Sequence, residues 1–210
     1  MEEHRLIVLI VEPDANQPLV DELMDCIRID PQLSQLIDFV KAVTTDQALV
    51  RKYPNLFSPM TTHMFAERER TGLLLCQRKV EGQIHGILST EVGSALLHNH
   101  AIIQISLAEL EQVQASQFRA DLLIIGVTLD PDVRRDKLTA GMNTMCYLSN
   151  QDVIRFVRGL PDDHRFVAKD DEMDPLNLFL LIQNLGLFTG AGPDYVQTEA
   201  VRKLPIKYRT

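Results

Sequence analysis

Two histidines separated by one residue, His98 and His100, form the pair whose spacing is closest to that of metal ligands. Such a pair holds a metal only when a third protein ligand converges on it. No cysteine or carboxylate lies at a helpful spacing, so the segment is interpreted as a polar loop without a metal. Ser106 and Ser149 lack the G-x-S-x-G context of an activated nucleophile. We therefore predict neither a metal site nor a catalytic serine.

The three cysteines, Cys26, Cys76 and Cys146, form no C-x-x-C motif and lie in apolar stretches. That pattern predicts buried, reduced thiols in a cytoplasmic protein. The net charge of −8 argues against a surface that coats nucleic acid. The first apolar run, Leu6–Val11, is too short for a membrane span and follows acidic residues rather than a basic leader. We expect a cytoplasmic protein that binds neither nucleic acid nor membrane.

Short apolar runs indicate where strands lie. Leu6–Val11, Ala101–Leu107 and Leu122–Thr128 are nearly continuous, as in strands that are buried on both faces of a parallel sheet. Met145–Leu148 is a fourth run, and Phe39–Val43 is a weaker strand candidate. These segments predict a sheet with the core on both sides.

Segments with helical periodicity separate these runs. Pro18–Ile27 has apolar residues four positions apart, Gln151–Val157 has its apolar residues on one side, and Thr44–Thr45–Asp46 is suited to cap a helix. The alternation predicts an α/β fold, a doubly wound parallel sheet with right-handed crossovers.

Two regions exceed a minimal five-stranded fold. An insertion at about 54–98 contains Gly72–Val80 and Gly82–Val92, which are interpreted as a hairpin around Glu81–Gly82. Residues 161–210 are interpreted as a C-terminal extension packed on a domain of residues 1–160. Within it, Leu176–Leu185 predicts an apolar helix, and Leu204–Tyr208 is a last strand candidate. The apolar stretch Leu176–Leu187 either packs against the sheet or forms a homodimer contact.

Four segments, in order, resemble the receiver domain of bacterial response regulators. LIVLIVEPDANQPLVDEL (Leu6–Leu23) is similar to its first strand and helix, AVTTDQAL (Ala42–Leu49) to the second strand, and AIIQISLAEL (Ala101–Leu110) to the third. The longest segment, Leu122–Leu160, resembles the fourth strand with its terminal Thr, the fifth strand and the final helix. This resemblance implies a flavodoxin-like sheet in the strand order 2-1-3-4-5.

Phosphorylation of a receiver requires an acceptor carboxylate, acids that hold a divalent cation, and a hydroxyl and a lysine on the phosphoryl group. The acceptor position of the family falls on Gln104, whose amide is not a competent nucleophile. The acidic pair falls on Glu12 and Pro13, with Asp14 next, and the lysine falls on Asn150. Only Thr128 matches among the residues that would contact the phosphoryl group. The resemblance therefore implies a relict pocket, without a cofactor.

A receiver that cannot be phosphorylated implies a regulatory role that depends on protein–protein contact alone. The resemblance assigns the contact face to the stretch Lys137–Arg158, in which most apolar residues are expected in the core. Met142 and Tyr147 are the residues expected at the surface, because Met and Tyr suit adaptable, half-wet interfaces.

A second resemblance is to acetyl-CoA-dependent N-acetyltransferases. Leu73–Leu88 is similar to their central hairpin, Leu129–Ala140 to the turn that binds pyrophosphate, and Asn177–Phe188 to a late helix. The glycines of that turn, which let backbone N–H groups approach phosphate, fall here on Lys137 and Thr139. The acyltransferase remains the alternative to the regulatory protein.

Overall fold

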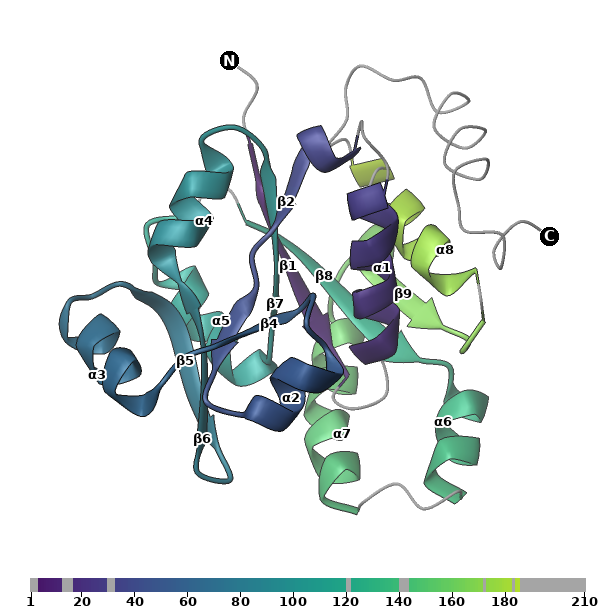
Figure 1. Cartoon of the computed structure of the whole chain (residues 1–210). Coiled ribbons are helices and arrows are strands. Elements are labelled where there is room, and N and C mark those ends of the chain that lie inside the picture. Colours follow the sequence, from purple (N-terminus) through teal and green to yellow (C-terminus); the bar gives the residue numbers. More distant parts are fainter. Residues whose placement is uncertain are drawn as a thin grey trace. The chain divides into compact units, whose positions relative to one another are not determined.

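The computed structural model describes residues 4–12, 17–29, 33–119, 122–139, 144–171, 173–182 and 184–185. The chain, whose helices and strands are labelled in Figure 1, divides into two compact units. Unit 1 comprises Met1–Ile10 and Gln35–Ile124, and unit 2 comprises Val11–Ser34 and Ile125–Thr210. The predicted boundary at residue 160 is not one of these divisions, and the predicted strand at Leu204–Tyr208 lies outside the described residues.

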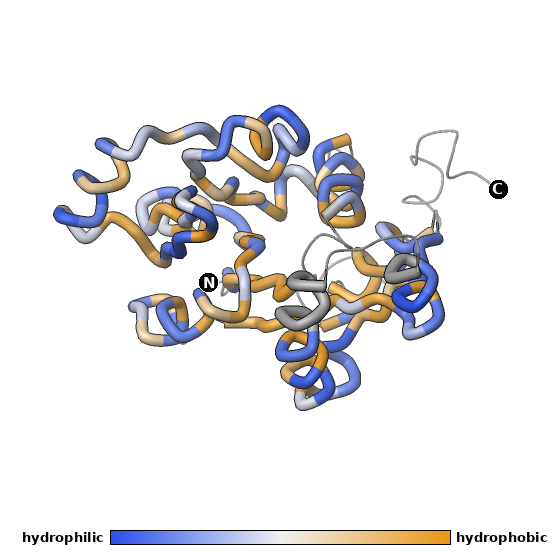
Figure 2. Tube along the Cα trace, turned by 90° about the horizontal axis from the view of Figure 1, so that it is seen from below, coloured by the Kyte–Doolittle hydropathy of each residue, from blue (hydrophilic) through white to orange (hydrophobic). Residues whose placement is uncertain are grey.

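Five strands form the larger sheet, and the strand pairings β2–β7, β7–β1 and β8–β9 are all parallel. The strands are β1 (Leu6–Val11), β2 (Ile37–Phe39), β7 (His100–Ile105), β8 (Leu122–Leu129) and β9 (Arg165–Ala168). All six residues of β1 are buried, and the chain after the N-terminus is hydrophobic along this strand (Figure 2). The prediction of a parallel α/β sheet from continuous apolar runs is confirmed.

The order of the strands differs from the predicted one. The sheet runs β2-β7-β1-β8-β9, which is 2-3-1-4-5 when its strands are numbered along the chain. The predicted order 2-1-3-4-5 is therefore wrong, because β7 pairs with both β1 and β2 and so separates them. An apolar strand such as β7 is suited to either a central or an edge position, so its composition does not fix its neighbours.

The fifth strand was also predicted in the wrong segment. Met145–Leu148 lies within the helix α7 (Thr144–Arg158), and the fifth strand is β9. A four-residue apolar run does not distinguish a strand from one turn of a helix, whereas the longer periodicity of Gln151–Val157 did indicate this helix correctly. Its residues Val153, Ile154 and Val157 are buried.

A second sheet, wholly within unit 1, has the order β4-β3-β6-β5. Its strands are β3 (Ala42–Thr44), β4 (Phe57–Pro59), β5 (Leu74–Val80) and β6 (Gln83–Leu88). The predicted hairpin is confirmed: β5 and β6 pair antiparallel, and Glu81 and Gly82 take φ angles of 49° and 83° in the turn. Its second strand ends at Leu88, earlier than predicted, because the helix α4 (Ser89–Leu96) begins there.

The weak strand candidate Phe39–Val43 is divided between the two sheets. Val40 N still donates to Ile102 O of β7, at 2.9 Å, whereas Ala42 N donates to Leu56 O, also at 2.9 Å, just before β4. Lys41 is the single residue between these hydrogen bonds. The chain therefore changes sheets within one residue, which a single apolar run could not reveal.

Helices α2, α3 and α5 complete unit 1. They span Gln47–Lys52, Thr62–Arg70 and Leu107–Gln114. Asp46 caps α2 as predicted, accepting from Ala48 N and Leu49 N. Phe65 of α3 lies in a hydrophobic core with Val43 and Leu88.

Unit 2 contains α1 (Gln17–Ile29), α6 (Pro131–Thr139), α7 and α8 (Asp174–Ile182). The helices α1 and α8 pack against each other (Figure 1). Leu178, Phe179 and Ile182 of α8 are buried, so this apolar helix packs within its own unit. None of the helices in the described residues is long and apolar enough to cross a membrane.

Candidate functional site at the end of β1

A buried ion pair lies at the carboxyl end of β1, in unit 2. The carboxylate of Glu12, which is fully buried, accepts from Arg134 Nε at Oε1 and from Arg134 Nη2 at Oε2, both at 2.8 Å. Oε2 also accepts from the backbone N–H of Leu129 at 3.0 Å. Three donors from one arginine and one strand end thus converge on a single carboxylate.

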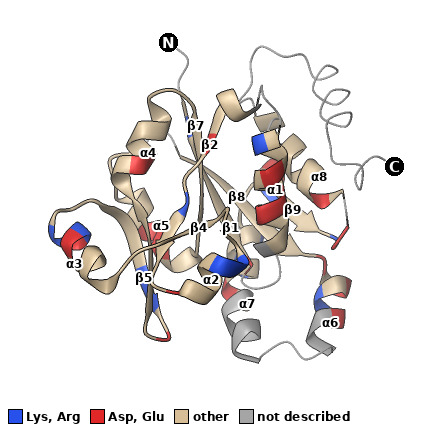
Figure 3. Ribbon diagram, in the orientation of Figure 1, with Lys and Arg blue, Asp and Glu red and all other residues tan. Residues whose placement is uncertain are grey.

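The ends of β1 and β8 and the start of α6 position these groups. Glu12 N donates to Val127 O of β8 at 3.0 Å, which fixes the backbone of Glu12 beside that strand. The helix α6 begins at Pro131, a residue suited to the first helical position, and Asp130 accepts from Asp132 N at 2.9 Å. Arg134 follows one turn into this helix, which carries both charge signs (Figure 3).

The geometry holds Arg134 in two ways. Its Nη2 donates both to Glu12 and to Leu129 O, the latter at 2.7 Å, and its side chain is 12% exposed. A bidentate arginine–carboxylate pair is strong and geometrically specific. With most of its acceptor sites engaged by donors of the protein, the carboxylate of Glu12 is directed at the protein rather than at a substrate. Arg134 is equally not available to an external anion while Glu12 holds it.

The residues of the predicted relict pocket fall on different elements of the chain. Glu12 lies in the ion pair, and Thr128, 7% exposed, lies on β8 between the two residues of that strand that contact Glu12. Gln104 lies on β7 in unit 1, opposite Leu9, and is half-buried. Asn150 falls on α7 rather than after a strand, and its side chain lies outside the described part. Asp14 lies outside the described residues.

The described residues do not include the side chains of the predicted interaction surface. Tyr147 falls on α7, but its side chain lies outside the described residues, as does Met142 altogether. The surface role of these residues stays a prediction.

Sequence reasoning missed Arg134. The resemblance to acyltransferases assigns the segment around it to a pyrophosphate-binding turn, with Lys137 and Thr139 at the glycine positions. Both residues lie in α6, and their side chains lie outside the described part. A usable signal existed, because an acid directly after a strand buried on both faces requires a cation. Arg134 and Arg135 follow the apolar strand segment Leu122–Thr128, and their positive charge made them candidates for this cation.

Unit 1 contains a second buried carboxylate, Glu109 of α5. It accepts from Ser106 N at 2.9 Å and from Ser106 Oγ at 2.7 Å, closing a capping box at the start of the helix. Cys76 donates to it at 3.9 Å, and burial, followed by the charge of Glu109, raises the pKa of this thiol well above its ordinary value. Cys76 is thus a buried, unreactive thiol, as predicted, whereas Cys26 is only partly buried.

His85 of β6 is a buried imidazole in unit 1. Its Nδ1 lies 3.1 Å from Thr44 Oγ1, and its side chain is 8% exposed. Burial lowers the pKa of His85 below its usual 6.5, and the positive charge of Arg78 adds to this effect. The imidazole is therefore kept neutral in the folded chain.

His100 of the His98–His100 pair contacts two residues near the N-terminus, Arg5 and His4. His100 Nδ1 accepts from Arg5 N at 3.1 Å, and the rings of His4 and His100 make an edge contact with centroids 5.7 Å apart. Over the residues that the structure describes, no three His, Cys, Asp or Glu side chains gather as metal ligands.

Comparison with known proteins gives a fold likeness only. No protein-family model matches the chain, and no curated protein matches its sequence. Among solved structures, the guanylate kinase of Anaplasma phagocytophilum is similar over 94% of this chain and 96% of its own, with a TM-score of 0.64. The two sequences are 12% identical, so the likeness concerns the fold and not the activity.

Proposed function

We propose that this chain is a non-catalytic regulatory protein that acts in the cytoplasm by binding another protein, without being phosphorylated itself. The observation that supports this most directly is the Glu12–Arg134 pair. In open parallel α/β sheets, ligands bind outside the carboxyl ends of the strands. At the end of β1, the protein's own carboxylate takes up the donors that would otherwise face a ligand.

Phosphoryl transfer is the function that the name of the structural neighbour suggests, and the sequence after β1 argues against it. Phosphate-binding turns between a strand and a helix use glycines, so that backbone N–H groups approach the phosphate, and a lysine. Here the connection to α1 reads Glu-Pro-Asp-Ala-Asn over residues 12–16, with two acids and neither glycine nor lysine. This turn therefore lacks the residue types that bind the phosphates of a nucleotide.

The residue types at the receiver positions support a function that does not depend on phosphorylation, whereas the strand order does not bear on it. Gln104 provides an amide where a receiver requires a nucleophilic carboxylate, and Asn150 replaces the lysine. The proposal does not require the strand order of a receiver, which this sheet lacks. It keeps from the resemblance only a signalling role that depends on contact with a protein partner.

The proposal is tested first by ligand-dependent unfolding of the full chain. Melting curves would be compared in buffer and with four additions: Mg²⁺ plus ATP, guanosine monophosphate, Mg²⁺ plus beryllium trifluoride, and acetyl-CoA. A ligand at about 100 times its dissociation constant adds roughly 2.7 kcal/mol to the native state, which shifts a melting temperature measurably. We expect no shift with any of them. A shift with a nucleotide or with acetyl-CoA would replace the proposal with an enzyme of that class.

A second experiment tests the protein-binding role itself. Cross-linking in extract of the source organism, with the full chain as bait, should enrich one protein saturably, and the purified pair should bind in solution. The double substitution Met142→Ala and Tyr147→Ala should weaken this complex. The matched control is Val167→Ala, which shortens a side chain that is 47% exposed on β9. Equal binding by all three proteins would contradict the predicted surface, and absence of any saturable partner would contradict the proposed function.

A further inference from the structure

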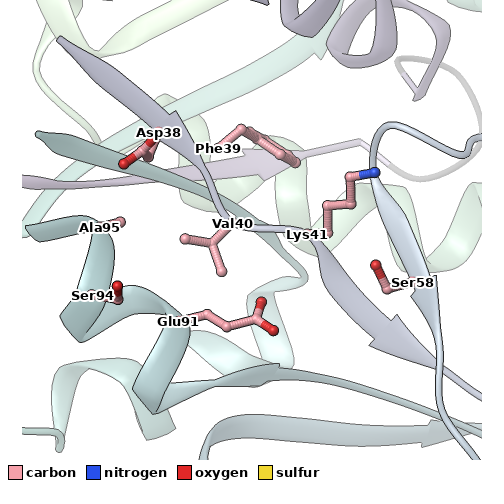
Figure 4. A pocket seen from close by; sticks show the side chains of 8 residues that line it. All are labelled: Asp38, Phe39, Val40, Lys41, Ser58, Glu91, Ser94 and Ala95. Carbon is pink, nitrogen blue, oxygen red and sulfur yellow. The ribbon is translucent and has the colours of Figure 1, made fainter. Parts of the chain in front are cut away.

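A pocket of about 300 Å³ lies in unit 1, beside the point where the chain changes from one sheet to the other. Figure 4 shows Val40 and Lys41 on one side of it and Glu91 and Ser94 of α4 on another, with Ser58 of β4 completing the wall. The volume is that of the smaller pockets that bind small molecules.

Both connections between the two sheets meet at this pocket. The first is the Val40–Lys41 step between β2 and β3, and the second is α4, which joins β6 to β7. The pocket therefore lies where a bound molecule would contact both links within unit 1, rather than on a single element.

The carboxylate of Glu91 gives the pocket its chemical character. Glu91 is the acid in the first turn of α4, and desolvation raises its pKa above the usual value for a glutamate. Neither a hydrogen bond nor an ion pair engages this carboxylate within the described part of the chain. Glu91 is thus an exposed anion of the pocket lining that has no counter-ion among the described residues.

The neighbouring charges do not supply that counter-ion. Lys41 Nζ donates to Pro54 O at 2.8 Å, and Figure 4 shows its ammonium turned away from Glu91. Asp38, the other acid of the lining, accepts from Asn99 Nδ2 at 3.1 Å. The lining thus has two acids and one cation, and its balance of charge favours a positive ligand.

We propose that this pocket binds a small organic cation, an ammonium or guanidinium group on a short aliphatic chain, with Glu91 as its counter-ion. The hydroxyls of Ser58 and Ser94 are suited to accept further N–H groups, and Val40 offers apolar contact to the chain of the ligand. A bound cation would offset the desolvation that raises the pKa of Glu91. This inference is independent of the proposed regulatory function.

The test is a calorimetric titration of agmatine, which has both cationic groups on a four-carbon chain, into the full-length protein. It is run at physiological ionic strength, where exposed charges are screened. We expect saturable binding of one agmatine per chain. The substitution Glu91→Gln should raise the dissociation constant about tenfold, because it removes the charge that pairs with the ligand while the size of the side chain stays the same.

The matched control is Glu111→Gln, which removes an exposed carboxylate from α5 of the same unit. It should leave the dissociation constant unchanged. Ser94→Phe, which fills the pocket from an exposed position, should abolish binding while the melting temperature of the free protein is retained. Absence of saturable binding to the wild-type chain would overturn the inference. Equal weakening by Glu91→Gln and Glu111→Gln would also overturn it, because agmatine would then be adsorbing to an acidic surface.

Discussion

Glu12 and Arg134 are 122 positions apart in the sequence, yet their side chains form a bidentate ion pair with both N–O distances at 2.8 Å. The carboxylate is fully buried and the guanidinium nearly so. Such a pair is costly to bury and is retained only when nearly every polar atom finds a partner. Here the additional partners are the backbone N–H and C=O of Leu129.

Replacing Arg134 by methionine should lower the free energy of unfolding by about 3–5 kcal/mol, because it leaves an uncompensated buried carboxylate. Urea unfolding of the purified variant measures this change. The matched control is Arg135→Met, one position along α6, whose ion pair with Asp132 is exposed on both sides. That substitution should cost less than about 1 kcal/mol. Equal decreases in the free energy of unfolding of the two variants would show that the buried ion pair contributes no more to stability than the exposed one.

Removing the carboxylate of Glu12 should turn the end of β1 into an anion site. In Glu12→Ala the donors of Arg134 and Leu129 N would face a space that a small anion fills, so inorganic phosphate should stabilise this variant more than the wild-type chain. The measurement is the melting temperature as a function of phosphate at constant ionic strength. The double variant Glu12→Ala, Arg134→Met serves as control and should lose the effect. If phosphate raised the melting temperature equally in all three proteins, Arg134 and Leu129 N would not be the donors that bind it.

Gly126→Ala should be destabilising through overpacking in unit 2. A Cβ at this position of β8 would lie 2.5 Å and 2.8 Å from the two γ-carbons of Val157. We expect a loss of about 1–3 kcal/mol in urea unfolding, partly restored by Val157→Ala. The contrasting substitution is Gly93→Ala in α4, where the nearest atom would be 3.8 Å away, at Phe118. It should stabilise the protein by up to about 1 kcal/mol, since alanine favours the helix.

The stability of the protein should fall in mild acid because of His85. The pKa of His85 is lowered in the folded chain, so the unfolded chain binds a proton from about pH 6.5 downward while the folded chain does not. The free energy of unfolding should therefore decrease as the pH is lowered through that range, by up to about 1.4 kcal/mol per pH unit. His85→Gln should reduce this slope, whereas His98→Gln, at an exposed position, should not. Unfolding curves at several pH values measure both, and equal slopes in all three proteins would contradict a neutral, buried His85.

Features governed by nearest neighbours were predicted well. The apolar runs of β1, β7 and β8, the helical spacing of α1, the cap at Asp46 and the turn at Glu81–Gly82 all follow from local preferences. The candidate residue Glu12 was also identified, through the resemblance to the acidic pair of receiver domains. Its partner was not, because nothing in the spacing of Glu12 and Arg134 records that β1 and α6 meet.

The sequence by itself determined the fold class, since continuous apolar strands that alternate with helices have few solutions other than a parallel α/β sheet. Tertiary structure alone decided the strand order, the division of Phe39–Val43 between two sheets, and the helical state of Met145–Leu148. The physical reason is the same in each case. Strand pairing and the pairing of buried charges join residues that are distant along the chain, and their free energy depends on the partner rather than on the local composition.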